Sequence, residues 1–129
     1  RVKVTSNLLA QSTGVNPVVI RNILSALKRA GIVTVTRGTG GAELCREPAE
    51  ITLYQIYSAL EPDGLTSLIR IHPCGQRPCL VARNIQTVLE GPYHSIENAI
   101  RTAMESVTLA SMLEEFHRSL EDDNLPKKE

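Results

Sequence analysis

The chain has 129 residues, 42% of them hydrophobic and 3% aromatic, with no tryptophan and a formal net charge of zero. This length can bury one ordinary core, and the scarcity of rings argues against the stacking platforms that bind single-stranded nucleic acid. No apolar run approaches the roughly 20 residues of a bilayer-spanning helix and no signal peptide is recognisable, so we expect a cytoplasmic protein with no membrane partner.

The zero net charge hides two halves of opposite sign. Residues 1–46 carry seven basic side chains against one acidic side chain, Glu43, and residues 47–129 carry seven basic against thirteen acidic ones. A strongly basic segment attracts phosphate by releasing counterions, whereas an acidic segment is repelled by it. The charge division therefore favours nucleic-acid binding by the first half and a different role for the second.

The first half begins with two predicted helices. Residues 5–13 form a short one, capped by Thr5 or Ser6 and followed by a turn at Gly14. Asn16 and Pro17 mark the next start, because an Asn side chain accepts from an orphan backbone N–H and proline fits the first helical position.

The second predicted helix is amphipathic. Its apolar positions recur at i, i+3, i+4 and i+7 from Ile20 to Leu27, and Gly31 ends it in a left-handed conformation. Two helices joined by a tight turn are typical of a helix-turn-helix, although an ordinary helical hairpin fits the same pattern. The residues expected to face DNA here are Asn16, Pro17, Val18, Arg21 and Asn22.

The segment after Gly31 favours DNA binding over the plain hairpin. Residues 32–36 and 42–45 read as two strands around a glycine-rich turn, which makes the unit a winged helix. The turn supplies a cation and exposed backbone N–H groups for phosphate or the minor groove, from Arg37, Gly38 and Thr39. A nucleotide-binding loop is excluded, because no Lys-Ser/Thr pair follows and the turn leads into a strand.

These blocks resemble the Rrf-two family of bacterial winged-helix transcription regulators, which includes an iron–sulfur cluster regulator and a cysteine-metabolism repressor. The matching residues are 16–21, 27–33, 37–42 and 48–53, and the likeness extends from Val4 to Leu120. The resemblance implies duplex DNA as the partner, a homodimer as the active form, and a further helix before Val4.

The acidic half is predicted to be helical. A loop covers residues 61–79, helical spacing resumes over residues 80–120, and residues 121–129 form a charged, disordered tail. Pro92 must kink the long helix or divide it in two, and Thr108 caps a last short helix. The fold class is therefore mainly α with a small β-hairpin: a winged helix-turn-helix domain at residues 1–60 and a long C-terminal dimerisation helix.

A long apolar stripe in this helix needs a cover that a domain of about 60 residues cannot provide. The simplest cover is the same helix of a second subunit, which gives a two-fold dimer; folding back onto the winged domain is the alternative. The residues expected at the interface are Ile85, Val88, Leu89, Ile96, Ile100 and Met104.

Three cysteines at irregular spacing do not make a disulfide framework, which fits a reducing compartment. Cys74 and Cys79 lie where the resemblance places three clustered cysteines that ligate an iron–sulfur cluster. Because only two are present, we expect no cofactor, and no metal site is assigned. His72, Cys74 and Cys79 remain candidates for a partial metal site or a thiol switch, and ordinary loop thiols are the plain alternative.

No constellation of catalytic residues accompanies the three histidines, so we expect a regulator and no enzyme. The sequence predicts a repressor that binds a palindromic operator as a homodimer, with thiol-based sensing. The alternatives are a winged-helix module for protein contacts and a regulator that responds to a small ligand without redox chemistry. The sequence does not name the effector.

Overall fold

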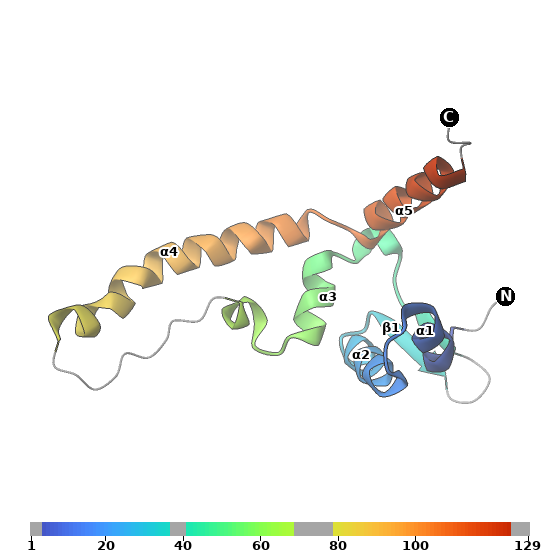
Figure 1. Cartoon of the computed structure of the whole chain (residues 1–129), viewed down its shortest axis with the longest axis horizontal. Coiled ribbons are helices and arrows are strands. Elements are labelled where there is room, and N and C mark those ends of the chain that lie inside the picture. Colours follow the sequence, from blue (N-terminus) through green and yellow to red (C-terminus); the bar gives the residue numbers. More distant parts are fainter. Residues whose placement is uncertain (1–3, 37–40, 69–78, 125–129) are drawn as a thin grey trace.

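The computed structural model describes residues 4–36, 41–68 and 79–124. Its helices are α1 (Ser6–Thr13), α2 (Pro17–Arg29), α3 (Leu53–Leu60), α4 (Leu80–Glu105) and α5 (Leu109–Asn124), with one-turn 3-10 helices η1 (Pro48–Glu50) and η2 (Gly64–Ser67). The strands β1 (Val33–Thr36) and β2 (Gly41–Leu44) form an antiparallel hairpin. Figure 1 shows α1, α2 and the hairpin packed together at one end, with α4 extending away as a long arm. The predicted fold class, mainly α with a winged helix-turn-helix, is confirmed.

The ends of the first two helices follow from their capping residues. The side chain of Thr5 accepts a hydrogen bond from the backbone N–H of Leu8, and that of Asn16 accepts one from Val18 at 2.8 Å. At the end of α2, Gly31 has a φ of 67°, and the N–H of Ile32 donates to the carbonyl of Leu27 at 3.0 Å. This way of ending a helix needs a residue in the left-handed conformation, which glycine adopts without a steric penalty.

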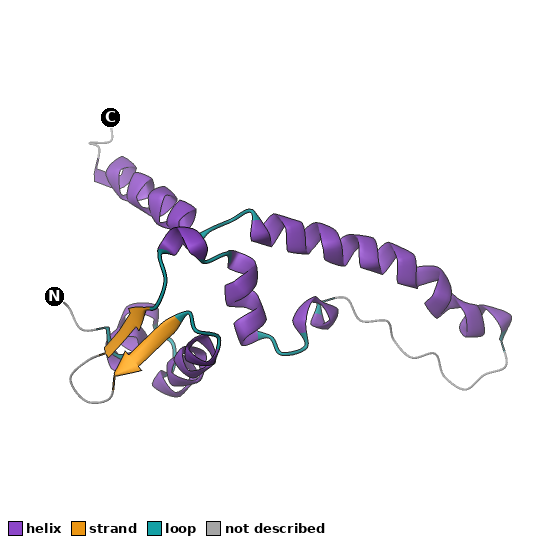
Figure 2. Ribbon diagram, turned by 180° about the vertical axis from the view of Figure 1, so that it is seen from behind, coloured by secondary structure: helices purple, strands orange, loops and turns teal. Residues whose placement is uncertain are grey.

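The hairpin continues the chain directly out of that turn (Figure 2). Val33 pairs with Leu44 and Thr36 with Gly41, so each strand lies within one residue of the predicted range. Val4 runs beside the second strand, and its carbonyl accepts a hydrogen bond from the N–H of Ala42 at 2.7 Å. A Cβ on Gly41 would lie 2.9 Å from that carbonyl oxygen, so this approach requires a glycine.

The core of the winged half forms where the helices meet the hairpin. Ile32, Val33 and Ile51 are buried, and Ile51 is fully inaccessible to solvent. Half-buried apolar side chains surround them: Leu27, Val35, Ile56, Ala59 and Leu109. Leu109 belongs to α5, so the C-terminal half contributes to the core of the winged half.

The two halves are also joined through their backbones. The N–H of Leu53 donates to the carbonyl of Val107 at 2.8 Å, and the N–H of Leu109 donates to the carbonyl of Ile51 at 2.8 Å. This short antiparallel bridge, together with the packing of α4 against α3, fixes the α4–α5 turn on the winged half. The sequence pattern did not indicate this connection.

The segment after α3, predicted as a loop, contains one turn of 3-10 helix in its first part. Residues 64–67 form η2, and Leu65 there is buried with 5% of its surface exposed. The hydroxyl of Tyr57 donates to the carbonyl of Gly64 at 3.2 Å. The isolated Leu65 gave no periodic signal, because a single turn offers only one inward position.

The C-terminal helices are more continuous than predicted. Pro92 lies inside α4, which runs unbroken, so the division into two helices is wrong. Thr108 does cap α5 through the N–H of Ser111, but α5 has 16 residues and is not short. It continues through Asn124, so the tail expected from residue 121 is helical in its first part. In the part of the chain described, no helix combines the length and apolar character needed to cross a membrane.

Candidate DNA-binding surface

The beginning of α2 presents several side chains that are largely open to solvent. Val18 and Val19 leave 52% and 46% of their surfaces exposed, and Arg21 and Asn22 are exposed beside them. Exposed β-branched side chains at the first turn of a helix are suited to the methyl group of thymine, and arginine is suited to guanine or phosphate. The oxygen of Asn16 is used by the cap, so its amide N–H groups are the donors left for other partners.

A groove connects this helix with the hairpin. Arg21, Ser25 and Lys28 line it at i, i+4 and i+7 of α2, and Thr36 and Gly41 close its opposite side. Its volume is about 620 Å³, and the lining contributed by the described part of the chain includes no acidic residue. Both basic side chains on this face of α2 therefore point into the space between the helix and the wing.

The charges of this end of the molecule have one dominant sign. Helix α2 carries Arg21, Lys28 and Arg29 and no acidic residue. Of the predicted contacts, Asn16, Pro17, Val18, Arg21 and Asn22 come together at the start of α2. Arg37, Gly38 and Thr39, predicted at the wing tip, lie outside the described residues.

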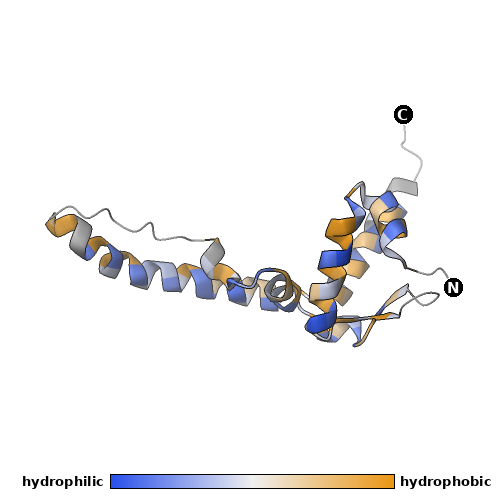
Figure 3. Ribbon diagram, turned by 90° about the horizontal axis from the view of Figure 1, so that it is seen from below, coloured by the Kyte–Doolittle hydropathy of each residue, from blue (hydrophilic) through white to orange (hydrophobic). Residues whose placement is uncertain are grey.

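The predicted interface stripe lies along α4, where hydrophilic and hydrophobic residues alternate along the helix (Figure 3). Val88 and Ile96 are the most open of the six, with 65% and 45% of their surfaces exposed. The other four are half-buried, namely Ile85, Leu89, Ile100 and Met104. Within the single chain the stripe is therefore covered only in part.

Helix α5 carries a second apolar face that was not assigned to the interface. Its exposed large apolar side chains are Met112, Leu113, Phe116 and Leu120. They recur at helical spacing, which is the signal that could have extended the predicted interface beyond α4.

The cysteines are divided between the two halves. Cys79 is exposed and immediately precedes α4, and Cys45 is exposed and immediately follows β2. His72 and Cys74 lie outside the described residues. Among the residues that are described, no three His, Cys, Asp or Glu side chains gather in a way that could hold a metal ion.

Comparison with known proteins agrees with this geometry. Residues 1–115 match the model of the Rrf2 (Rrf-two) family, described as an iron-dependent transcriptional regulator. The predicted HTH-type transcriptional regulator YwnA of Bacillus subtilis is 32% identical over 111 residues, which cover 86% of this chain and 82% of YwnA.

Solved structures share the fold. A predicted transcriptional regulator from Lactobacillus plantarum is 29% identical with a TM-score of 0.71, over 95% of this chain and 86% of that one. The IscR protein of T. potens is 24% identical with a TM-score of 0.65, over 98% and 77% of the two chains. Members of this family are regulators and not enzymes. The chain therefore belongs to the Rrf2 family and is a transcriptional regulator with a winged-helix DNA-binding fold.

Proposed function

We propose that this protein is a cytoplasmic repressor that binds a palindromic operator in double-stranded DNA as a homodimer. The exposed first turn of α2 is the observation that carries the proposal. Val18, Arg21 and Asn22 enter the major groove and read base edges, with the groove between α2 and the wing following the phosphates. A dimer seated over a promoter excludes polymerase, which is why repression is preferred to activation.

The homodimer is supported by the surface that the single chain leaves open. Val88 and Ile96 on α4 are exposed, as are Met112, Leu113 and Phe116 on α5. The apolar faces of α4 and α5 are the surfaces that a two-fold partner covers in this proposal.

The operator geometry tests the dimer and the recognition helix together. Two copies of α2 related by a two-fold read half-sites one helical turn apart, about 34 Å, or a multiple of that distance. Selection from a random duplex library should therefore yield an inverted repeat with that spacing. Enrichment of a single, non-repeated site would contradict the homodimer, and enrichment of no site would favour a winged helix used for protein contacts.

A thiol switch is the proposed signal, carried by Cys74 and Cys79. Each thiol loses a proton and an electron to an oxidant such as hydrogen peroxide, and the two sulfurs form one disulfide. Cys79 directly precedes α4, so the bond would constrain the entry to the long helix. Cys45, beside the wing, is expected to take no part.

The switch is tested by measuring operator affinity before and after oxidation, and again after reduction. Oxidation should change the affinity of the wild type and of Cys45→Ser, and should have no effect on Cys74→Ser or Cys79→Ser. An unchanged wild-type affinity would leave both cysteines as ordinary thiols of the connecting segment.

We propose no resident iron–sulfur cluster, although the family description is iron-dependent. Iron–sulfur clusters held by cysteine alone use four thiolates, and the chain has three cysteines in all. One of these, Cys45, follows the wing strand β2 while Cys79 opens α4. The donor set therefore does not fit a cluster, and anaerobically purified protein should show neither iron nor visible absorption.

A further inference from the structure

An open cleft lies on the winged half at the opposite end of α2 from the proposed recognition turn. Its volume is about 490 Å³, within the range of small-ligand sites. It is lined by the turn after α2, by Arg46 and by one face of α3, and the lining residues are Ala30, Gly31, Ile32, Arg46, Tyr54, Gln55, Ser58 and Ala59. The thirteen residues of α2 separate it from Asn16 by about 20 Å, which places it away from DNA.

Arg46 gives this cleft an unmatched charge. Its side chain is half-buried, and the Nε atom is buried without a hydrogen-bond partner among the described residues. None of the described residues that line the cleft is acidic. A buried donor without a partner costs about 1–3 kcal/mol, more when the group is charged, so an acceptor that reached it would recover a favourable interaction.

The other residues that line the cleft limit the kind of ligand that can carry the acceptor. Ile32, Ala30 and Ala59 are apolar, and Tyr54 adds an aromatic ring. The Oε1 of Gln55 is already used, because it accepts from the N–H of Thr52 in the cap of α3, and its Nε2–H groups are left as neutral donors. Ser58 adds a neutral hydroxyl, and Arg46 is the one charged residue among the described residues that line the cleft, so the lining balances one negative charge and not the two of a phosphate monoester.

We propose that this cleft binds a small organic carboxylate with a compact apolar or aromatic body. The carboxylate accepts from the guanidinium of Arg46 in the paired geometry that arginine offers, with the hydroxyl of Ser58 as a further donor. The body of the ligand lies against Ile32, Ala59 and the ring of Tyr54.

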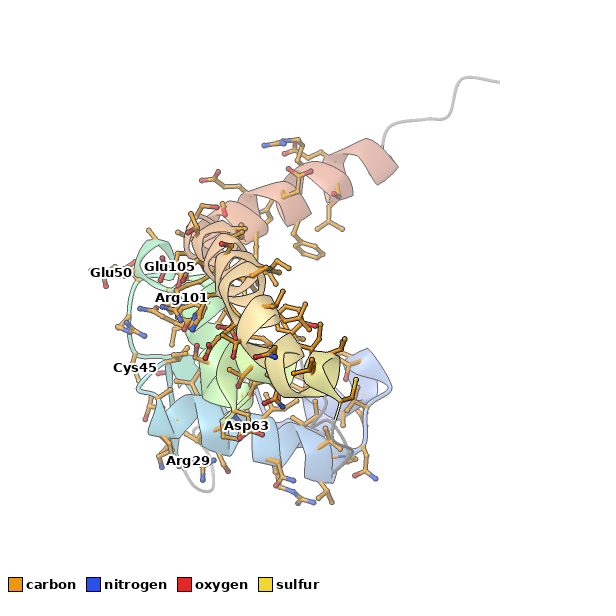
Figure 4. All side chains as sticks on the ribbon, turned by 90° about the vertical axis from the view of Figure 1, so that its left-hand side faces the viewer. Arg29, Cys45, Glu50, Asp63, Arg101 and Glu105 are labelled. Atoms are coloured by element: carbon orange, nitrogen blue, oxygen red, sulfur yellow. The ribbon has the colours of Figure 1, made fainter. Side chains whose placement is uncertain are left out.

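The position of Tyr54 connects the cleft to the long helix. The guanidinium carbon of Arg101, on α4, lies 5.4 Å from the centre of the Tyr54 ring, a cation–π distance. Figure 4 shows Arg101 and Glu105 on the side of α4 that faces the winged half. A ligand in the cleft that contacts Tyr54 therefore lies at the junction between the winged half and α4. If the protein is the proposed repressor, this ligand is an effector of DNA binding.

Ligand binding is tested on the isolated protein by titrating benzoate and following amide and arginine side-chain resonances by nuclear magnetic resonance. Benzoate should give saturable shifts at Gly31, Ser58 and the Nε–H of Arg46. The neutral analogue benzamide should bind at least about tenfold more weakly, as should inorganic phosphate. Equal binding of either would overturn the assignment to carboxylates, as would the absence of saturable shifts at millimolar benzoate.

Variants separate a specific site from a general attraction to positive charge. Arg46→Gln should weaken benzoate binding by roughly tenfold or more. Arg46→Lys keeps the charge without the paired donors and should weaken it by less. Arg118→Gln removes an exposed arginine on α5 and should have no effect. An Arg46→Gln protein that folds, by its amide spectrum, and still binds benzoate like the wild type would refute the site.

The effector role rests on the proposed function and has its own measurement. Operator affinity is determined with and without saturating benzoate for the wild type and Arg46→Gln. A change in the wild type alone supports coupling through Tyr54 and α4. Binding of benzoate without any change in operator affinity would overturn the effector role and leave the binding site standing. A wild-type protein that does not bind DNA even without benzoate would refute the proposed function itself.

Discussion

At the scale of single residues, the winged half depends on a few positions whose geometry no other residue type satisfies equally well. Gly41 has a φ of 80° and lets Val4 approach the hairpin, and Ile51 is the fully buried centre of the core. The turn at Gly31 could be predicted from sequence, because it follows an apolar helical stripe. The close approach at Gly41 could not, since it depends on a segment 37 positions earlier in the chain.

Replacing Gly41 with Ala should detach Val4 from the hairpin. The new Cβ would collide with the Val4 carbonyl and would also occupy a left-handed conformation, at a combined cost of roughly 1–3 kcal/mol. Hydrogen exchange of the Ala42 amide should accelerate. Gly31→Ala is the control, because its φ is similarly positive but no atom lies within 4 Å of the added Cβ. Unchanged exchange of Ala42 in Gly41→Ala would contradict this account.

Ile51→Ala should be among the most destabilising substitutions in the chain. It removes a side chain with no exposed surface from the junction of the hairpin, α3 and α5, at a cost of about 2–5 kcal/mol. Urea denaturation at fixed protein concentration measures the loss. Ile51→Val should cost only about 0.5–1.5 kcal/mol. Val18→Ala, at an exposed position, should change the free energy of unfolding little, and a similar loss at both sites would argue against this core.

At the scale of elements, sequence signals worked where a repeat of several residues was present. The stripe from Ile20 to Leu27 located α2, and the β-branched content of residues 32–36 located the first strand of the hairpin. Features that depend on single contacts could not be predicted from the sequence. They are the bridge between residues 51–53 and 107–109 and the turn that buries Leu65. Of the two outcomes expected at Pro92, a kinked helix or two helices, the structure has one helix that runs through the proline.

A charge on the open side of the α4 stripe tests the proposed interface. Ile96 leaves 45% of its surface exposed in one chain, so Ile96→Glu is compatible with a folded monomer but would bury an unpaired charge in a dimer. We expect sedimentation to show monomers, with Ile100→Glu behaving similarly or becoming insoluble.

Asn98→Glu is the matched control for this substitution. Asn98 is exposed and lies outside the stripe on the same helix, so the control should leave the assembly unchanged. A soluble, folded Ile96→Glu protein that remains dimeric would exclude Ile96 from the interface.

At the scale of the whole molecule, the division of charge follows the division of structure. Among the described residues, three of the basic side chains of the first 46 positions lie on α2, while the acidic excess of the second half lies mainly on α4 and α5. Composition alone predicted this division and its consequence for phosphate. It could not predict the cleft at Arg46 or the contact between Arg101 and Tyr54, because both depend on how α3 packs against its neighbours.

The most direct test of the central claim is the affinity of the protein for duplex DNA over a range of salt concentrations. The logarithm of the binding constant should fall linearly with the logarithm of the salt concentration. The slope should be about −0.9 for each phosphate that the protein neutralises. Arg21→Gln should cost roughly 1–3 kcal/mol if it contacts a base, and Arg37→Ala should flatten the slope by about one unit. Arg118→Gln, on α5, should match the wild type. The account predicts this pattern, and it would be contradicted by a wild-type protein that does not bind duplex DNA at low salt.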